Sequence, residues 1–290
     1  MESQTGASLI KLLDDPDELV YEAVSQKIQE LGPVLIPDLE FAAKETFSPI
    51  LHERVEEIIG KLQMIQLKAD FADWINSPDP GLFDGAWLIA RSHYPDLSKK
   101  DLWKQIKPLR DEIWLEISED LTGLEKIRIM NTLFFGHGQI KLNEDYPDGP
   151  GNNYLNWVIK YGKANEHSLS LLYAVIAQDL GMPVYAVGMP DYPILSYVDV
   201  PPVFEGPVDP ELLEVLFYIN TPDQGEYHSR GDITNYLIHE SHPLNPAYYK
   251  PVKNREFIRL CVQKLLHDWK LGENEMLVFV LQDLLKLWKL

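Results

Sequence analysis

The sequence predicts an α+β protein that is mostly helical, with a small antiparallel sheet packed on one buried core helix. Apolar residues recur at helical spacing from Leu169 to Leu180 and cover nearly the whole circumference of that helix. Gly181 and Pro183 then form a helix-stop signal. Segments typical of strands follow at 184–187, 194–200 and 212–220. Amphipathic helical patterns at both ends of the chain complete the fold class.

The N-terminal region, residues 1–66, is expected to form a HEAT-like helical cap. Asp17 is placed to cap a helix that ends before Gly32 and Pro33. Further helices are expected at 36–45 and 49–65. Because no repeat period is visible, one helical hairpin is a better interpretation than a solenoid.

The central region, residues 67–243, is expected to hold the core. Its predicted helices are 70–76, 82–92, 98–117 with Pro108 bending or dividing it, 121–135 and 229–239. A loop-rich segment lies at 136–153 and a proline-rich loop at 200–210. His137 stands between two glycines, which allow close backbone approach, so it is a candidate binding residue. Ser168 is interpreted as the N-cap of the core helix.

The C-terminal region, residues 244–290, is expected to be a helical hairpin that resembles a lone tetratricopeptide-like unit. Its two helices meet at Gly272 and Glu273. Cys261 is the single cysteine of the chain and lies in an apolar helical pattern, which favours a buried structural thiol. A single cysteine cannot form an internal disulfide, so a reducing cytoplasm is the expected location.

Composition limits the classes of partner. The 290 residues include 45 acidic and 26 basic side chains, for a net charge of −19. Nucleic acids and anionic membranes are bound by positive surfaces, so neither is an expected partner. The N-terminus lacks the features of a signal peptide, and no apolar run reaches the length of a membrane span.

The central region resembles the transglutaminase-like (papain-like) superfamily, and within it the bacterial SirB-type N-terminal domain branch. The resemblance covers most of the chain with gaps, and many spaced positions agree in order. The stretches that carry it are LNWVI at 155–159, KANEHSL at 163–169, LY at 172–173, IA at 176–177, VGMPDY at 187–192, FYIN at 217–220 and RGDI at 230–233.

Active members of this superfamily use a cysteine at the start of the core helix, a histidine on the next strand and an aspartate after the strand beyond. The matching positions here are Glu166, Tyr192 and Asn220. A carboxylate is not a thiolate nucleophile, a phenol is a poor base near neutral pH, and an amide cannot stabilise an imidazolium as an anion does. The resemblance therefore implies a pseudoenzyme.

The function expected from this reasoning is binding or regulation of a protein or peptide partner by a catalytically inactive cleft. The candidate cleft residues are Asn165, Glu166, Ser168, Tyr192, Asn220 and His137. One alternative is a cryptic hydrolase or amidase that uses Ser168 or Glu166 with a histidine such as His137. Another is a structural helical scaffold whose cleft is filled by side chains.

No metal or other cofactor is expected. The sequence His239-Glu240-Ser241-His242 places its histidines three residues apart, whereas the zincin motif needs four so that both ligands share one helix face. No glycine-rich phosphate loop follows a predicted strand. The sequence leaves the oligomeric state and the identity of the partner open.

Overall fold

The computed structural model describes residues 8–137, 139–200 and 209–289. The chain divides into two compact units, Met1–Ala72 and Asp73–Leu290. The region predicted at 244–290 lies within the second unit, together with most of the region predicted at 67–243. Three parts of the predicted elements lie outside the described residues. They are residues 1–7 of the predicted cap, Gly138 beside His137, and positions 201–208 of the predicted proline-rich loop.

The first unit is helical. The carboxylate of Asp17 accepts a hydrogen bond from the Leu19 N–H and so caps α2 (Glu18–Leu31), as predicted. Gly32 ends that helix with a φ of 84°, a conformation that favours glycine. The helices that follow are η1 (Pro33–Leu35), α3 (Ile36–Glu45) and α4 (Pro49–Asn76). The apolar core of this unit includes Leu13, Ile28, Leu39, Val55, Ile58 and Leu62.

The predicted break between helices at 49–65 and 70–76 is wrong, because α4 runs through both segments without interruption. The intervening residues Gln66, Leu67, Lys68 and Ala69 all have high helix propensity, and none is a proline or glycine. Leu67 is buried, so this turn of the helix is also stabilised by packing.

Of the first three helices that lie wholly in the second unit, α6 and α7 have N-termini capped by side chains, whereas α5 begins after Gly81 without such a cap. Ser98 caps α6 and Thr122 forms a capping box with Glu125 at α7. Pro108 lies inside α6, which remains one helix. The helix predicted over 121–135 is instead a short α-helix followed by a π-helix. These elements are α5 (Leu82–Arg91), α6 (Lys99–Glu116), α7 (Gly123–Asn131) and η2 (Thr132–His137).

The core helix is α9 (Glu166–Asp179), and every residue from Ser168 to Ala177 is buried. This confirms a central helix enclosed on all sides. The predicted cap at Ser168 is wrong. Asn165 is the N-cap and Ser168 occupies the third helical position, where its hydroxyl accepts from the Asn165 N–H and completes a capping box. Preceding it are η3 (Pro150–Asn153) and α8 (Leu155–Tyr161).

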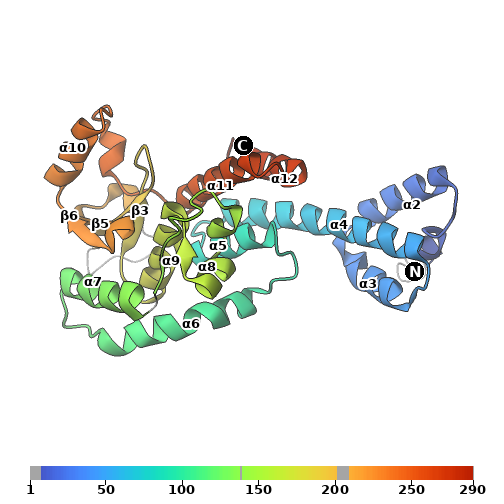
Figure 1. Ribbon diagram of the computed structural model, residues 1–290, viewed down its shortest axis with the longest axis horizontal. Coiled ribbons are helices and arrows are strands. Elements are labelled where there is room, and N and C mark those ends of the chain that lie inside the picture. The colour runs from blue at the N-terminus through green and yellow to red at the C-terminus, as the bar shows by residue number, and fades with distance from the viewer. Residues whose placement is uncertain (1–7, 138, 201–208, 290) are drawn as a thin grey trace. The chain divides into compact units, whose positions relative to one another are not determined.

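The sheet has four antiparallel strands in sequence order, and in Figure 1 it lies between α9 and α10 (Arg230–His239). Its strands are β3 (Val184–Val187), β4 (Ile194–Val198), β5 (Val215–Asn220) and β6 (Glu226–His228). Three of them were predicted, and β6 was not. The third begins later than predicted because η4 (Pro210–Leu212) precedes it. A separate parallel pair joins β1 (Lys141–Leu142) to β2 (Lys163–Ala164).

The C-terminal segment packs on this core. Its elements are η6 (Pro246–Tyr249), α11 (Asn254–Leu271), α12 (Glu275–Lys286) and η7 (Leu287–Lys289). α11 packs against α5, α9 and α12. A mostly helical α+β protein with a small antiparallel sheet is therefore confirmed. The HEAT-like and tetratricopeptide-like character of the flanking helices stays a prediction.

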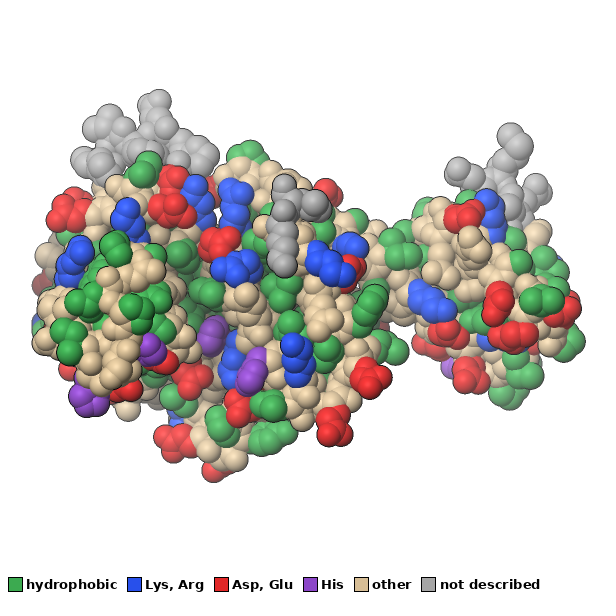
Figure 2. All heavy atoms as spheres, turned by 90° about the horizontal axis from the view of Figure 1, so that it is seen from above, with side chains coloured by type: hydrophobic (Ala, Val, Ile, Leu, Met, Phe, Trp, Pro, Cys, Tyr) green, Lys and Arg blue, Asp and Glu red, His purple; other side chains and the backbone are tan. Residues whose placement is uncertain are grey.

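In the described part of the chain, no helix combines the length and the apolar composition that crossing a membrane requires. Figure 2 shows acidic and basic side chains intermingled on the face that it displays. The acidic excess of the composition is therefore not gathered into one continuous patch on that face.

Substitution of Gly85 would test how closely α11 packs against α5. A Cβ atom at this position would lie 2.6 Å from side-chain carbons of both Ile258 and Trp74. We expect Gly85→Ala to lower the free energy of unfolding by about 1–3 kcal/mol, because side chains in a close-packed core must shift. Urea denaturation measures the effect. Gly231→Ala on α10 is the control, since its Cβ meets only ordinary contacts, and equal stability of the two variants would contradict the packing.

Candidate functional site

The N-terminus of α9 holds three of the candidate residues. Asn165 is 2% exposed, and its Nδ2 donates to Asn153 Oδ1 at 2.9 Å. The Ser168 hydroxyl is buried and lies 3.1 Å and 3.2 Å from the Asn165 backbone nitrogen and oxygen. Glu166 is partly exposed in the first turn of the helix, where the macrodipole favours a negative charge.

Ser170, one turn into α9, holds two distant loops together. Its fully buried hydroxyl donates to the Pro193 carbonyl at 3.1 Å and lies 2.6 Å from the Thr221 hydroxyl. Pro193 directly follows Tyr192, and Thr221 directly follows Asn220. The α9 side chain thus fixes the loop that carries Tyr192 and the strand end that carries Asn220.

The structure brings Glu166, Tyr192 and Asn220 together. Burial raises the pKa of Tyr192, the adjacent Asn220 amide opposes that rise, and the Glu166 carboxylate adds to it. Glu166 from α9 and Asn220 from the end of β5 therefore both act on the phenol of Tyr192, which the β3–β4 loop carries. We call this group the triad-position site.

Other acidic residues surround the triad-position site. The Asp191 and Asp223 carboxylates also raise the pKa of Tyr192. Asp191 Oδ2 accepts from the Tyr236 hydroxyl at 2.7 Å and lies 2.9 Å from His242 Nε2. These two contacts hold the pKa of Asp191 below its usual range, Tyr236 having the larger effect, so Asp191 is ionised at neutral pH.

Asn220 adds an acceptor without a partner. Its side-chain Oδ1 atom is buried and makes no hydrogen bond to the residues that the structure describes. A buried carbonyl oxygen of this kind carries a desolvation cost unless a donor reaches it. The site therefore consists mainly of carboxylates and an unused acceptor, a composition that matches a positively charged donor.

Four residues that contribute to this site are not predicted from the sequence. Asp191, Asp223, Tyr236 and His242 were not predicted to belong to it. Asp191 directly precedes Tyr192, and Asp223 follows Asn220 by three residues, so acidic neighbours of the candidate positions were the available signal. Tyr236 and His242 come from α10 and the segment after it, and their approach depends on tertiary packing.

His137, by contrast, lies against α6. It belongs to η2, and its Nδ1 is 2.5 Å from Glu112 Oε1. The Ser168 hydroxyl has its contacts with the Asn165 backbone. The Ser168–His137 hydrogen bond that the hydrolase alternative invokes is therefore not present between these residues.

Comparison with known proteins identifies the family. The family model described as the transglutaminase-like superfamily matches residues 100–263. The chain belongs to the transglutaminase-like superfamily. It is also 30% identical over 112 residues to each of two proteins named UPF0162 protein, from Xylella fastidiosa strains Temecula1 / ATCC 700964 and 9a5c. That match spans 38% of this chain and 40% of either relative. No solved structure matches the chain.

The single cysteine, Cys261, lies on α11 and is 5% exposed. Burial raises the pKa of its thiol strongly, so the thiolate form is disfavoured. The prediction that Cys261 is buried is confirmed.

A second polar cluster links the start of α9 to α11. Asn153 donates to Asp268 Oδ2 at 2.7 Å, and Lys264 Nζ lies 2.8 Å from Asp268 Oδ1 and 3.0 Å from Asp148 Oδ1. Asp268 is fully buried. The sequence did not indicate this cluster, because Asp148 and Asn153 lie more than 100 residues from Lys264 and Asp268 and only packing brings the two pairs together.

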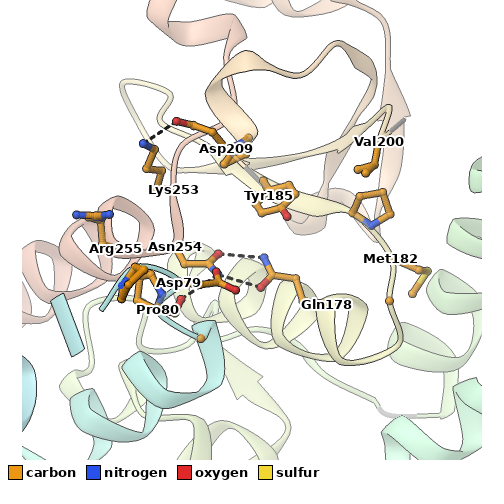
Figure 3. Close-up of a pocket in the computed structure, with 15 residues that line it drawn as sticks. Asp79, Pro80, Gln178, Met182, Tyr185, Val200, Asp209, Lys253, Asn254 and Arg255 are labelled. Carbon is orange, nitrogen blue, oxygen red and sulfur yellow. Dashed lines mark hydrogen bonds and ion pairs between the residues drawn. The ribbon is translucent and has the colours of Figure 1, made fainter. Parts of the chain in front are cut away.

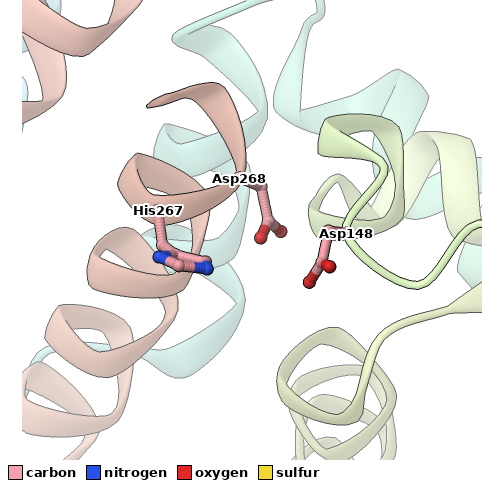
Figure 4. Close-up of side chains that lie close together, drawn as sticks. All are labelled: Asp148, His267 and Asp268. Atoms are coloured by element: carbon pink, nitrogen blue, oxygen red, sulfur yellow. The ribbon is translucent and has the colours of Figure 1, made fainter. Parts of the chain in front are cut away.

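Figure 4 shows that Asp148, His267 and Asp268 turn their side chains toward one another. One ligand atom from each lies within 4.8 Å of the others, so these residues could hold a metal ion. The Lys264 ammonium already contacts both carboxylates, however. Their proximity is accounted for by this ion-paired cluster, since a buried carboxylate needs a charged partner.

His167 lies near this cluster. Burial is the main cause that lowers its pKa to about 4, and the Lys264 charge lowers it further. Its Nδ1 atom is buried and has no hydrogen-bond partner within the described residues. His167 is therefore neutral at pH 7.

Two cavities lie beside the core helix. One, of about 600 Å³, is lined by residues that include Phe135, Lys141, Lys163, Leu169, Thr221 and Gln224. The other, of about 850 Å³, opens at the opposite end of α9 around Gln178 and Met182. Neither lining includes Glu166, Tyr192 or Asn220, so the triad-position site is not part of either cavity.

The depressed pKa of His167 predicts how stability depends on pH. Between about 6.5 and 4 the unfolded chain binds a proton at His167 that the folded chain does not, so stability falls as pH drops through this window. The loss is at most about 3 kcal/mol. We expect His167→Gln to flatten this dependence in urea titrations from pH 7 to pH 4.5. His239→Gln, at an exposed histidine, is the control, and an unchanged pH slope in His167→Gln would contradict the assignment.

The environment of Cys261 predicts its reactivity. Iodoacetamide reacts with thiolates, so we expect no labelling of the native protein at neutral pH and complete labelling after unfolding in guanidinium. Intact-mass spectrometry measures the extent. A Lys270→Cys variant adds an exposed thiol on the same helix and provides the positive control. Rapid labelling of native Cys261 would show that the thiol is accessible.

Proposed function

We propose that this chain is a catalytically inactive member of the transglutaminase-like superfamily, of the SirB-type branch, that binds or regulates a protein or peptide partner. The partner contacts the triad-position site. The observation that carries this proposal is that Glu166 and Asn220 both act on the Tyr192 phenol while the single cysteine is buried in α11. The resemblance assigns these three residues to the triad positions of active members.

The chemistry of the site supports binding over turnover. Covalent catalysis requires an activated nucleophile within reach of a base. Glu166 provides a carboxylate in place of a thiolate, and burial raises the pKa of Tyr192, which makes the phenol still less available as a base near neutral pH. The Ser168 hydroxyl is buried and engaged by the Asn165 backbone.

The charge of the site supports a positively charged group on the partner. Glu166, Asp191 and Asp223 act on one phenol, and Asn220 offers an unused carbonyl oxygen. A lysine or arginine side chain would donate hydrogen bonds to these acceptors and reduce the repulsion among the carboxylates.

The surroundings support a macromolecular partner. Ile238 and Leu244 are 60% and 54% exposed, and they lie on α10 and the segment after it, which also supply Tyr236 and His242. Exposed aliphatic side chains beside a polar anchor are typical of protein interfaces, where an apolar contact region surrounds a few directional bonds.

The test uses hexapeptides blocked at both termini, so that only side chains carry charge. We expect peptides containing lysine or arginine to bind, as measured by fluorescence anisotropy, and matched peptides with glutamine at those positions to bind at least about tenfold more weakly. Glu166→Gln combined with Asp223→Asn is expected to reduce binding of the cationic peptides by a similar factor, and raised salt to weaken it.

Glu119→Gln, which removes an exposed carboxylate between α6 and α7, is the matched control. Mass spectrometry of the recovered peptides separates binding from turnover. Intact peptides agree with the proposal, whereas cleavage that disappears in Ser168→Ala would establish the hydrolase alternative. Equal binding of cationic and neutral peptides, or none at all, would refute the proposed partner chemistry.

A further inference from the structure

We propose that the outer edge of β1 binds an extended segment of the partner as an added strand, within the cavity of about 600 Å³ that β1 lines. This inference rests on the proposed function and deepens it, because it states how the same partner is held. A cationic side chain of the partner contacts the triad-position site, and the partner's backbone is bound by β1.

One edge of β1 is paired and the other is not. The Lys141 N–H donates to the Gly162 carbonyl at 3.1 Å. Two residues later, the Asn143 N–H donates to the Ala164 carbonyl at 2.8 Å. Successive residues of a strand turn their backbone groups to opposite edges, so the N–H and C=O of Leu142 face away from β2. Neither makes a hydrogen bond within the described part of the chain, and Leu142 lines the cavity. Such an edge is a template for another strand.

The charges that line this cavity cancel, which suits an uncharged backbone better than a charged ligand. Lys163 is paired with Asp145 at 2.6 Å. The other two charged residues of the lining, Lys141 and Glu144, are opposite in sign. A peptide group is uncharged and offers one donor and one acceptor, which are the groups that the free edge of β1 requires. The adjoining triad-position site holds carboxylates instead, so it takes the charged part of the partner.

The backbone around the cavity has uncommon conformations. Gln139 and Gln224 line it, and each has a φ of 50°. They are two of the four residues other than glycine that have a positive φ in the described part of the chain. Phe135, which belongs to the π-helix η2, also lines the cavity. Left-handed residues and π-helical turns gather at functional sites, so these features are a second, independent indication of a binding site.

The turn that follows β5 joins the cavity to the triad-position site. Pro222 and Gln224 line the cavity, whereas Asp223 between them contributes to the triad-position site. On α9, Leu169 lines the cavity and lies three residues after Glu166. Residues three apart are neighbours on the surface of a helix. A strand added to β1 therefore lies next to the carboxylates that are proposed to bind the partner's cation.

The larger cavity, at the other end of α9, has several polar side chains that already bind one another. Figure 3 shows the amides of Gln178 and Asn254 bonded together and Lys253 paired with Asp209. These groups are engaged within the protein, whereas the outward backbone groups of Leu142 are not. The cavity beside β1 is therefore the better match to a peptide backbone.

The first experiment measures hydrogen exchange of single backbone amides by NMR on the ¹⁵N-labelled full-length chain. The probe is a blocked hexapeptide with one arginine, as in the test of the proposed function. We expect the bound peptide to slow exchange of the Leu142 N–H by about fivefold or more, because this amide gains a hydrogen bond. The N–H groups of Lys141 and Asn143 already have partners, so they are the internal reference and should change less.

The second experiment uses versions of the same hexapeptide that each carry one N-methylated peptide bond. The methyl group removes one N–H and leaves every side chain in place. Alternate residues of a strand face the same edge, so we expect binding to weaken by about fivefold or more at one position, or at positions two apart. Methylation at the directly adjacent positions is the matched control. Fluorescence anisotropy measures the affinities, and an equal effect at all positions, or none at any, would overturn the proposal.

A variant of the chain tests the same contact from the other side. Leu142→Pro removes the outward N–H, and proline is compatible with an unpaired strand edge. We expect it to weaken binding of the arginine peptide by about fivefold or more. Leu142→Val also shortens the side chain but keeps the N–H, so it should bind nearly as well as the unaltered chain. Circular dichroism checks folding, and the methylated series decides the question if the proline variant does not fold.

These outcomes separate the added strand from the proposed function. Preference for arginine over glutamine peptides, without alternation in the methylated series and without protection of Leu142, would overturn the added strand and leave the proposed function intact. Loss of that preference would refute the proposed function, and the added strand with it. Protection of the Leu142 N–H in the free chain that grows with chain concentration would identify a second copy as the occupant and would also overturn the proposal.

Discussion

Burial of α9 from Ser168 to Ala177 is the constraint on which the second unit depends. A helix enclosed on all sides leaves its polar groups no access to water, so each must find a partner inside the protein. Ser170 reaches the Pro193 carbonyl and the Thr221 hydroxyl, and the Tyr173 hydroxyl donates to Asn131. Asn165 binds Asn153, which in turn binds Asp268. Each contact fixes another element against the helix.

These same contacts account for the triad-position site. The Ser170 hydroxyl positions the residues next to Tyr192 and Asn220, and Asn165 positions the first turn that carries Glu166. None of these supporting contacts requires a nucleophile or a base. Packing contacts of this kind hold the fold whatever chemistry the site carries out, so fold membership and activity are separate questions here.

Most helices and strands could be predicted from local sequence patterns, whereas contacts between residues far apart in the chain could not. Helical period and stop signals located α9, α11 and three of four strands, since these reflect local patterns. The capping role was assigned to Ser168 instead of Asn165, because both residue types cap helices and spacing alone does not decide between them. Lys264 beside Asp148, and His242 beside Asp191, could not be predicted, since only the tertiary fold joins them.

The two ends of α9 lie among different groups, and the fold explains why. At its N-terminus the helix dipole tolerates Glu166, and Asp191 and Asp223 arrive on loops that must stay near the surface. At its C-terminus, Gln178 is held by Asn254, which brings the uncapped start of α11 alongside. One buried helix thus fixes a group of carboxylates at its first turn and the start of α11 at its last turn.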